Sequence, residues 1–117
     1  LRGRIAPAQQ DRISVAGWTA GDLRAALAGA DVLVSAVPAA AWAPNDARAG
    51  LAALPRAAAV LEMAYGAATP LAGDARARTA RYADGLGMLV HQAARAIELA
   101  LGRPPPLPPL VDAVRAR

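Results

Sequence analysis

Apolar runs alternate with helix-forming segments along this chain. Val32–Val37 is a continuous apolar run that ends at Pro38, and Ala57–Ala64 is a second run of the same kind. Uninterrupted apolar runs are typical of parallel strands that are covered on both faces. We therefore expect both segments to be buried strands. Two shorter β-prone segments, Ile13–Val15 and Tyr82–Ala83, predict further strands.

The first helix has recognisable start and stop signals. Thr19 is a suitable N-cap and Asp22 lies in the first turn that follows it. Leu23 and Leu27 are four residues apart, so they share one face of the helix. Gly29 is a suitable helix end.

Similar patterns predict three more helices, over Ala47–Leu54, Leu71–Thr79 and Met88–Leu101. The last of these has the strongest apolar face and is followed by Gly102 as a cap. The residues of that face recur at the helical period: Leu89, Ala93, Ala96 or Ile97, and Ala100 or Leu101. A proline-rich stretch, Pro104–Pro109, predicts a stiff tail, with a last turn of helix within residues 110–117.

The alternation of strands and helices predicts an α/β fold. We expect a partial doubly wound, Rossmann-like parallel sheet with flanking helices and a long C-terminal helix. Ligands bind such sheets at the carboxyl ends of the strands. The sequence therefore directs attention to three segments: Ser35–Pro38, Met63–Gly66 and Asp84–Gln92.

Composition narrows the class of protein. The 117 residues suffice for one domain, and 56% are hydrophobic, but only 3% are aromatic. Burial of small side chains stabilises a fold weakly, so we expect a thin core that leans on another domain or another chain. The net charge is +4 and all 13 basic residues are arginine, the densest group being Arg76, Arg78 and Arg81. Without aromatic side chains interleaved for base stacking, this distribution does not favour a nucleic-acid surface.

Several kinds of chemistry are excluded by missing residue types. The chain has no Lys, so it cannot itself supply a lysine ammonium as base or Schiff base. It has no Cys, which excludes thiolate zinc sites and disulfides, and a single His makes a poor metal site. The longest uncharged run, Val32–Asn45, is broken by prolines and too short to span a membrane.

The segment Asp84–Ala94 offers candidate binding chemistry. Gly85 and Gly87 bracket a turn that opens a helix, where free N–H groups favour negative charge. Gln92 both donates and accepts, which suits a polyol, and the phenol of Tyr65 follows a buried strand. From the residues alone, an ordinary turn, a solvent-facing Gln92 and a tyrosine that closes the end of the sheet remain open. We interpret the neighbouring His91 as a surface residue.

Three motifs together resemble one enzyme family. They lie in the order Ala30–Pro38, then Val60–Tyr65 with Thr69–Leu71, then Asp84–Ala94 with Ile97–Leu99 and Gly102, and they cover roughly residues 30 to 106. The chain is similar in these segments to the shikimate dehydrogenases. The resemblance implies reversible reduction of 3-dehydroshikimate to shikimate with NADP, a step of aromatic amino-acid biosynthesis.

The resemblance also implies roles for particular residues. Tyr65 and Gln92 match positions that bind the substrate. The positions that match cofactor-binding residues are Ser35, Ala36, Val37, Pro38, Met63, Gly85 and Met88. No catalytic residue and no metal ligand is assigned within this chain.

Departures from the family pattern shape a further expectation. Ser35 and Val37 stand where Asn and Thr are usual, Glu62 stands where Asp is usual, and the loop Tyr65–Thr69 is one residue short. The family's substrate domain, with its catalytic Lys and Asp, and its Gly-rich phosphate loop have no counterpart here. We therefore expect a C-terminal part of a cytoplasmic dehydrogenase that is inactive alone. Its expected partners are the missing N-terminal substrate domain and a second copy in a homodimer.

The expected organisation is a cofactor-binding unit over residues 1–103 and a Pro-rich tail over residues 104–117. Two other interpretations stay open. The chain is alternatively a non-catalytic interaction module that folds on a partner, or a segment of a quinate or aminoshikimate dehydrogenase. The residues that distinguish quinate and aminoshikimate dehydrogenases from shikimate dehydrogenases lie mainly in the missing substrate domain.

Overall fold

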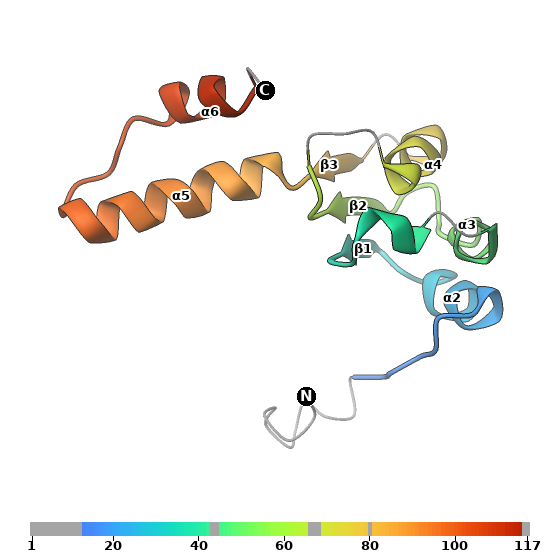
Figure 1. The fold of residues 1–117 in the computed structure, drawn as a ribbon. Coiled ribbons are helices and arrows are strands. Elements are labelled where there is room, and N and C mark those ends of the chain that lie inside the picture. The colour runs from blue at the N-terminus through green and yellow to red at the C-terminus, as the bar shows by residue number, and fades with distance from the viewer. Residues whose placement is uncertain (1–12, 43–44, 66–68, 80, 116–117) are drawn as a thin grey trace.

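The computed structural model describes residues 13–42, 45–65, 69–79 and 81–115. Its centre is a parallel sheet of three strands in the order β1 (Val32–Ser35), β2 (Ala59–Glu62) and β3 (Tyr82–Asp84). Figure 1 shows the three strands side by side. The predicted α/β architecture with a parallel sheet is confirmed.

Helices precede, connect and follow the strands. In chain order they are α2 (Ala20–Leu27), the 3₁₀ helix η2 (Ala39–Trp42), α3 (Asn45–Leu51), α4 (Pro70–Arg78), α5 (Leu86–Leu101) and α6 (Leu107–Arg115). In Figure 1, α2, α3 and α4 gather at one side of the sheet, whereas α5 leads away from it and α6 folds back along α5. None of the helices within the described ranges is long and apolar enough to cross a membrane.

The local signals for helix ends are confirmed. Thr19 and Asp22 form a capping box at the start of α2, with the Asp22 amide donating to Thr19 Oγ1 at 3.2 Å. Leu23 and Leu27 are both buried on the inner face of that helix. Gly102 ends α5 in the left-handed conformation, with φ of 69°.

The predicted strand at Ile13–Val15 is wrong. These residues are irregular, and the side chain of Val15 is 79% exposed. A strand is held by backbone pairing with a neighbour and by burial of one face. Within the described part of the chain no strand pairs with this segment, so neither contribution holds it in a sheet.

One face of the sheet is bare, which corrects the expectation of strands covered on both faces. Val60 on β2 is 2% exposed, whereas Val34 on β1 is 55% exposed. The register pairs Val60 with Leu33 and Val34 with Leu61, so these two valines point to opposite faces. The core that packs against the sheet includes Val60 and the partly buried Leu33, whereas α5 extends away from the strands (Figure 1).

The C-terminal helices also differ from expectation. The apolar face of α5 is not core: Val90 is the buried residue of that helix, and Leu101 is 65% exposed. α5 packs against α6 rather than across the strands. α6 begins at Leu107, earlier than expected, because prolines such as Pro108 and Pro109 fit a first helical turn, where their missing N–H groups would be unpaired anyway.

Some boundaries shift and some expectations fall outside the described ranges. α3 ends at Leu51 rather than Leu54, and both long strands are shorter than their apolar runs. Gly66, most of the loop that the sequence marks as one residue short, and residues 116–117 lie outside the described residues. The proposed division at residue 103 stays a prediction.

Two valines on neighbouring strands test which face of the sheet is covered. We expect Val60→Thr to lower the free energy of unfolding by about 1–3 kcal/mol, because it buries a hydroxyl without a partner. Val34→Thr, its matched control, should stay within about 0.5 kcal/mol, since its side chain already meets solvent. Urea denaturation followed by circular dichroism measures both. Equal losses would show that the bare face is covered after all.

Candidate functional site

The tips of β2 and β3 meet in a close backbone contact. A Cβ atom on Gly85 would lie 2.1 Å from the carbonyl oxygen of Met63, so only glycine fits there. The Gly85 amide donates to the carbonyl of Ala64 at 3.1 Å. This contact brings together two residues that the family resemblance assigns to cofactor binding.

α5 begins at the same place. Gly85 is its N-cap and offers no side chain, while Asp84 Oδ1 accepts from the Leu86 amide at 3.1 Å. The first N–H groups of a helix have no acceptor inside it, and the helix dipole makes this end positive. Met88 is half-buried one turn further on. The carboxyl edge of the sheet is therefore suited to a negatively charged or polar ligand.

A buried carboxylate lies behind this edge. Glu62, at the end of β2, is fully buried, and its Oε2 accepts from Thr69 Oγ1 at 2.6 Å and from the Tyr82 hydroxyl at 2.9 Å. Thr69 also caps α4, since its Oγ1 accepts from the Ala72 amide at 3.0 Å. Glu62 therefore ties the start of α4 to β3, and it anchors both ends of the loop that carries Tyr65.

This cluster was not predicted from the sequence, from which Glu62, Thr69 and Tyr82 received no polar contacts. The available signal was the two-residue period of β2, which places Glu62 on the same face as buried Val60. A carboxylate on a buried face requires partners.

The cluster shifts one titration. Burial, together with the hydrogen bond to Glu62, raises the pKa of Tyr82 to about 12, and burial has the larger effect. The Arg76 guanidinium, 4.5 Å from the centre of the Tyr82 ring, acts in the opposite direction. The other members of the arginine group serve the backbone: Arg78 donates to the carbonyl of Leu54, and Arg81 donates to that of Ala57.

The tip of β1 is organised differently. Ser35 is buried; its hydroxyl accepts from the Trp42 indole at 2.9 Å, and its carbonyl accepts from the Met63 amide at 2.8 Å. Val37 packs against the core, whereas Ala36 and Pro38 are exposed. At this tip Ser35 faces inward, and the two exposed residues are the ones open to a ligand.

Tyr65 and Gln92 each follow the carboxyl end of a strand, β2 and β3 respectively. Tyr65 follows β2 and is 50% exposed, and Gln92 is exposed on the second turn of α5. Within the described residues neither side chain makes a hydrogen bond, so both keep their polar groups for a ligand. Their convergence on one substrate stays a prediction. His91 is exposed, as expected.

Comparisons with known proteins agree with this geometry. Residues 85–115 match the family model described as the shikimate 5'-dehydrogenase C-terminal domain. A shikimate dehydrogenase (NADP(+)) of Rhodopseudomonas palustris is 37% identical over 105 residues, which are 89% of this chain and 37% of that relative. The crystal structure of Mycobacterium tuberculosis shikimate dehydrogenase matches with a TM-score of 0.66 and 37% identity, over 83% of this chain and 35% of that one. This chain is therefore similar over most of its length to about a third of these shikimate dehydrogenases, and residues 85–115 match the model of their C-terminal domain.

A further relative is more similar over a shorter stretch. A shikimate dehydrogenase (NADP(+)) of Nitrobacter winogradskyi is 55% identical over 56 residues, which are 47% of this chain and 20% of that relative. The match to the shikimate dehydrogenase family model begins at Gly85, the residue of the close contact, and runs through α5 to the end of α6. The recognition made from the three motifs is confirmed.

The raised pKa of Tyr82 gives a direct test of the Glu62 cluster. We expect the absorbance of tyrosinate to show a step near pH 12 that belongs to Tyr82. The pKa of Tyr82 in the folded chain is above the unfolded value of about 10. The contribution of Tyr82 to the free energy of unfolding is therefore complete below pH 10 and is lost as pH rises toward 12.

Spectrophotometric titration of Tyr82→Phe, with Tyr65→Phe as the matched variant, assigns this step. Tyr82→Phe should remove the step near pH 12, whereas Tyr65→Phe should retain it. A parent chain without a tyrosinate step near pH 12 would contradict the buried contact with Glu62.

Proposed function

We propose that this chain is the C-terminal part of an NADP-dependent shikimate dehydrogenase and contributes both substrate and cofactor contacts. The observation that carries the proposal is the contact of Gly85 on Met63, which joins two strand tips to the amino end of α5. The named activity of the relatives supplies the reaction, reversible reduction of 3-dehydroshikimate to shikimate. The chain spans 37% of the length of the first of these relatives.

Tyr65 and Gln92 are proposed to bind the substrate. Shikimate carries hydroxyls and a carboxylate, which require donors and acceptors in a fixed arrangement. A phenol supplies one donor and an acceptor, and a primary amide supplies two donors and an acceptor. Both side chains are exposed and make no hydrogen bond within the described residues, which supports this role.

The cofactor is proposed to lie across the strand tips. Gly85 permits close approach of backbone, Met63 and Met88 offer half-buried apolar surface, and Ala36–Pro38 border the tip of β1. Ser35 contributes indirectly, because its buried hydroxyl and carbonyl hold Trp42 and Met63 in place. NADPH would supply the hydride, while these residues position it and exclude water.

We expect proton transfer to depend on residues outside this chain. The chain has no lysine, and its 13 Lys and Arg residues are all arginine, whose guanidinium does not release a proton in proteins. The resemblance to shikimate dehydrogenases implies a catalytic Lys and Asp in a substrate domain. We therefore expect the 117 residues alone to give no turnover. A cytoplasmic location and a homodimer stay predictions.

Exposed apolar surface favours a second candidate, an interaction module that folds on a partner. Val32 and Val34 on the bare sheet face and Leu99 and Leu101 on α5 are all more than half exposed. Burying them against another domain or chain would stabilise the fold. Both candidates predict a partner, but only the dehydrogenase predicts catalysis once it is present.

A fusion protein tests the proposal. The chain replaces the corresponding C-terminal region of the Rhodopseudomonas palustris relative, and NADP-linked oxidation of shikimate is measured. We expect the fusion to turn over and Gln92→Ala to raise KM for shikimate about tenfold or more, because a hydrogen-bonding partner of the substrate is lost. A group that binds ground state and transition state alike changes KM more than kcat.

His91→Ala is the matched control, since it alters the neighbouring exposed position of the same helix. Its KM should stay within about twofold of the parent fusion. An inactive but folded fusion would count against the dehydrogenase and leave the interaction module in its place. Equal effects of the two substitutions would remove the substrate role of Gln92.

A further inference from the structure

A cavity lies between α3 and α4, away from the strand tips described above. Its volume is about 450 Å³. Arg56, which lines it, lies three residues before β2, and Arg78 is the last residue of α4. Both therefore lie toward the amino ends of the parallel strands, whereas Gly85 and Tyr65 lie at the carboxyl ends.

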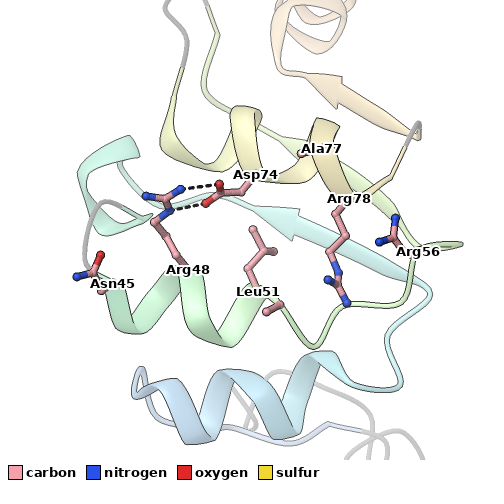
Figure 2. A pocket seen from close by; sticks show the side chains of 8 residues that line it. Asn45, Arg48, Leu51, Arg56, Asp74, Ala77 and Arg78 are labelled. Carbon is pink, nitrogen blue, oxygen red and sulfur yellow. Dashed lines mark hydrogen bonds and ion pairs between the residues drawn. The ribbon is translucent and has the colours of Figure 1, made fainter.

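The cavity has an excess of positive charge. Arg48 and Asp74 neutralise each other in a two-point ion pair, Nε to Oδ2 at 2.6 Å and Nη2 to Oδ1 at 2.8 Å. Figure 2 shows this pair at one end of the cavity and Arg56 and Arg78 at the other, with Leu51 between them. Within the described part of the chain, neither Arg56 nor Arg78 has a carboxylate partner.

Two unneutralised guanidiniums line the same cavity, and like charges repel each other. A bound dianion would relieve this repulsion. Arginine is well suited to such a ligand, since its planar fork matches the oxygens of a phosphate in a two-point contact.

One of the two guanidiniums is already oriented. Arg78 Nε donates to the carbonyl of Leu54, a fully buried residue in the turn after α3. This leaves the two terminal nitrogens of Arg78 for a ligand. A side chain fixed before binding loses less conformational entropy when the ligand arrives, which favours affinity.

The remaining lining is apolar. Leu51 is buried at its inner wall, and Ala52 and Ala77 flank it from α3's end and from α4. Small-molecule sites usually combine such apolar walls with a few polar groups, and their volumes begin at about 300 Å³. The combination fits a molecule with one doubly charged group and an apolar body.

We propose that the α3–α4 cavity binds a small organic phosphate monoester. The phosphate lies between Arg56 and Arg78, and the apolar body lies over Leu51, Ala52 and Ala77. This site is separate from the strand-tip site and does not depend on the proposed dehydrogenase activity.

Isothermal titration calorimetry with phenyl phosphate tests the proposal, with inorganic phosphate as the probe that lacks an apolar body. We expect saturable binding of phenyl phosphate and at least several-fold weaker binding of inorganic phosphate. Arg56 is exposed, so Arg56→Gln should not disturb folding. We expect this substitution to weaken the binding of phenyl phosphate about tenfold or more. Arg78→Lys should also weaken binding, because a lysine ammonium lacks the planar fork.

Arg103→Gln is the matched control, because it removes the same charge from an exposed position in the turn after α5. It should leave binding within about twofold. Equal weakening by Arg56→Gln and Arg103→Gln would reduce the site to general attraction of anions, and absence of saturable binding would overturn it. Inorganic phosphate that binds as tightly as phenyl phosphate would overturn the role of the apolar wall.

The same variant separates this proposal from the dehydrogenase. Arg56→Gln in the fusion protein should leave KM for shikimate and kcat unchanged. An inactive fusion therefore bears on the proposed function alone, while loss of phenyl phosphate binding bears on the cavity alone.

Discussion

The contact between the backbones of Gly85 and Met63 is the constraint on which the strand-tip site depends. It leaves no space for a side chain at residue 85, so the carboxyl ends of β2 and β3 lie against each other. Because α5 starts at Gly85, the same contact also sets where the positive end of that helix lies. The segment after β2, with Tyr65, and the second turn of α5, with Gln92, each follow the carboxyl end of one of these strands.

The buried carboxylate of Glu62 supports this arrangement from behind. A buried polar group is costly unless it makes hydrogen bonds. Here Thr69 and Tyr82 both donate to Oε2 of Glu62, so the cap of α4 and the strand β3 are joined to the end of β2. The bond between Tyr82 and Glu62 and the glycine contact both join the ends of β2 and β3.

Features encoded by neighbouring residues could be predicted from the sequence. The capping box of Thr19 and Asp22 and the left-handed Gly102 depend on only a few residues each, and the three family motifs marked the strand tips. Features set by distant packing could not. The bare face of β1 depends on which helices cover the sheet, and the bond between Glu62 and Tyr82 joins residues twenty positions apart through the register of two strands. An apolar run records that a strand is β-prone, but it does not record what covers it.

Residue 85 must be glycine because a side chain would collide with Met63, and not because the backbone there needs a conformation that only glycine adopts. Its φ is −73°, which any residue adopts, so only the approach of Met63 forbids a side chain. The most direct measurement is urea denaturation of Gly85→Ala beside Gly87→Ala, where a Cβ meets nothing within 4 Å. The account predicts a loss of about 1–3 kcal/mol for Gly85→Ala and a gain of about 0.5–1 kcal/mol for Gly87→Ala. A Gly85→Ala chain as stable as its parent would contradict it.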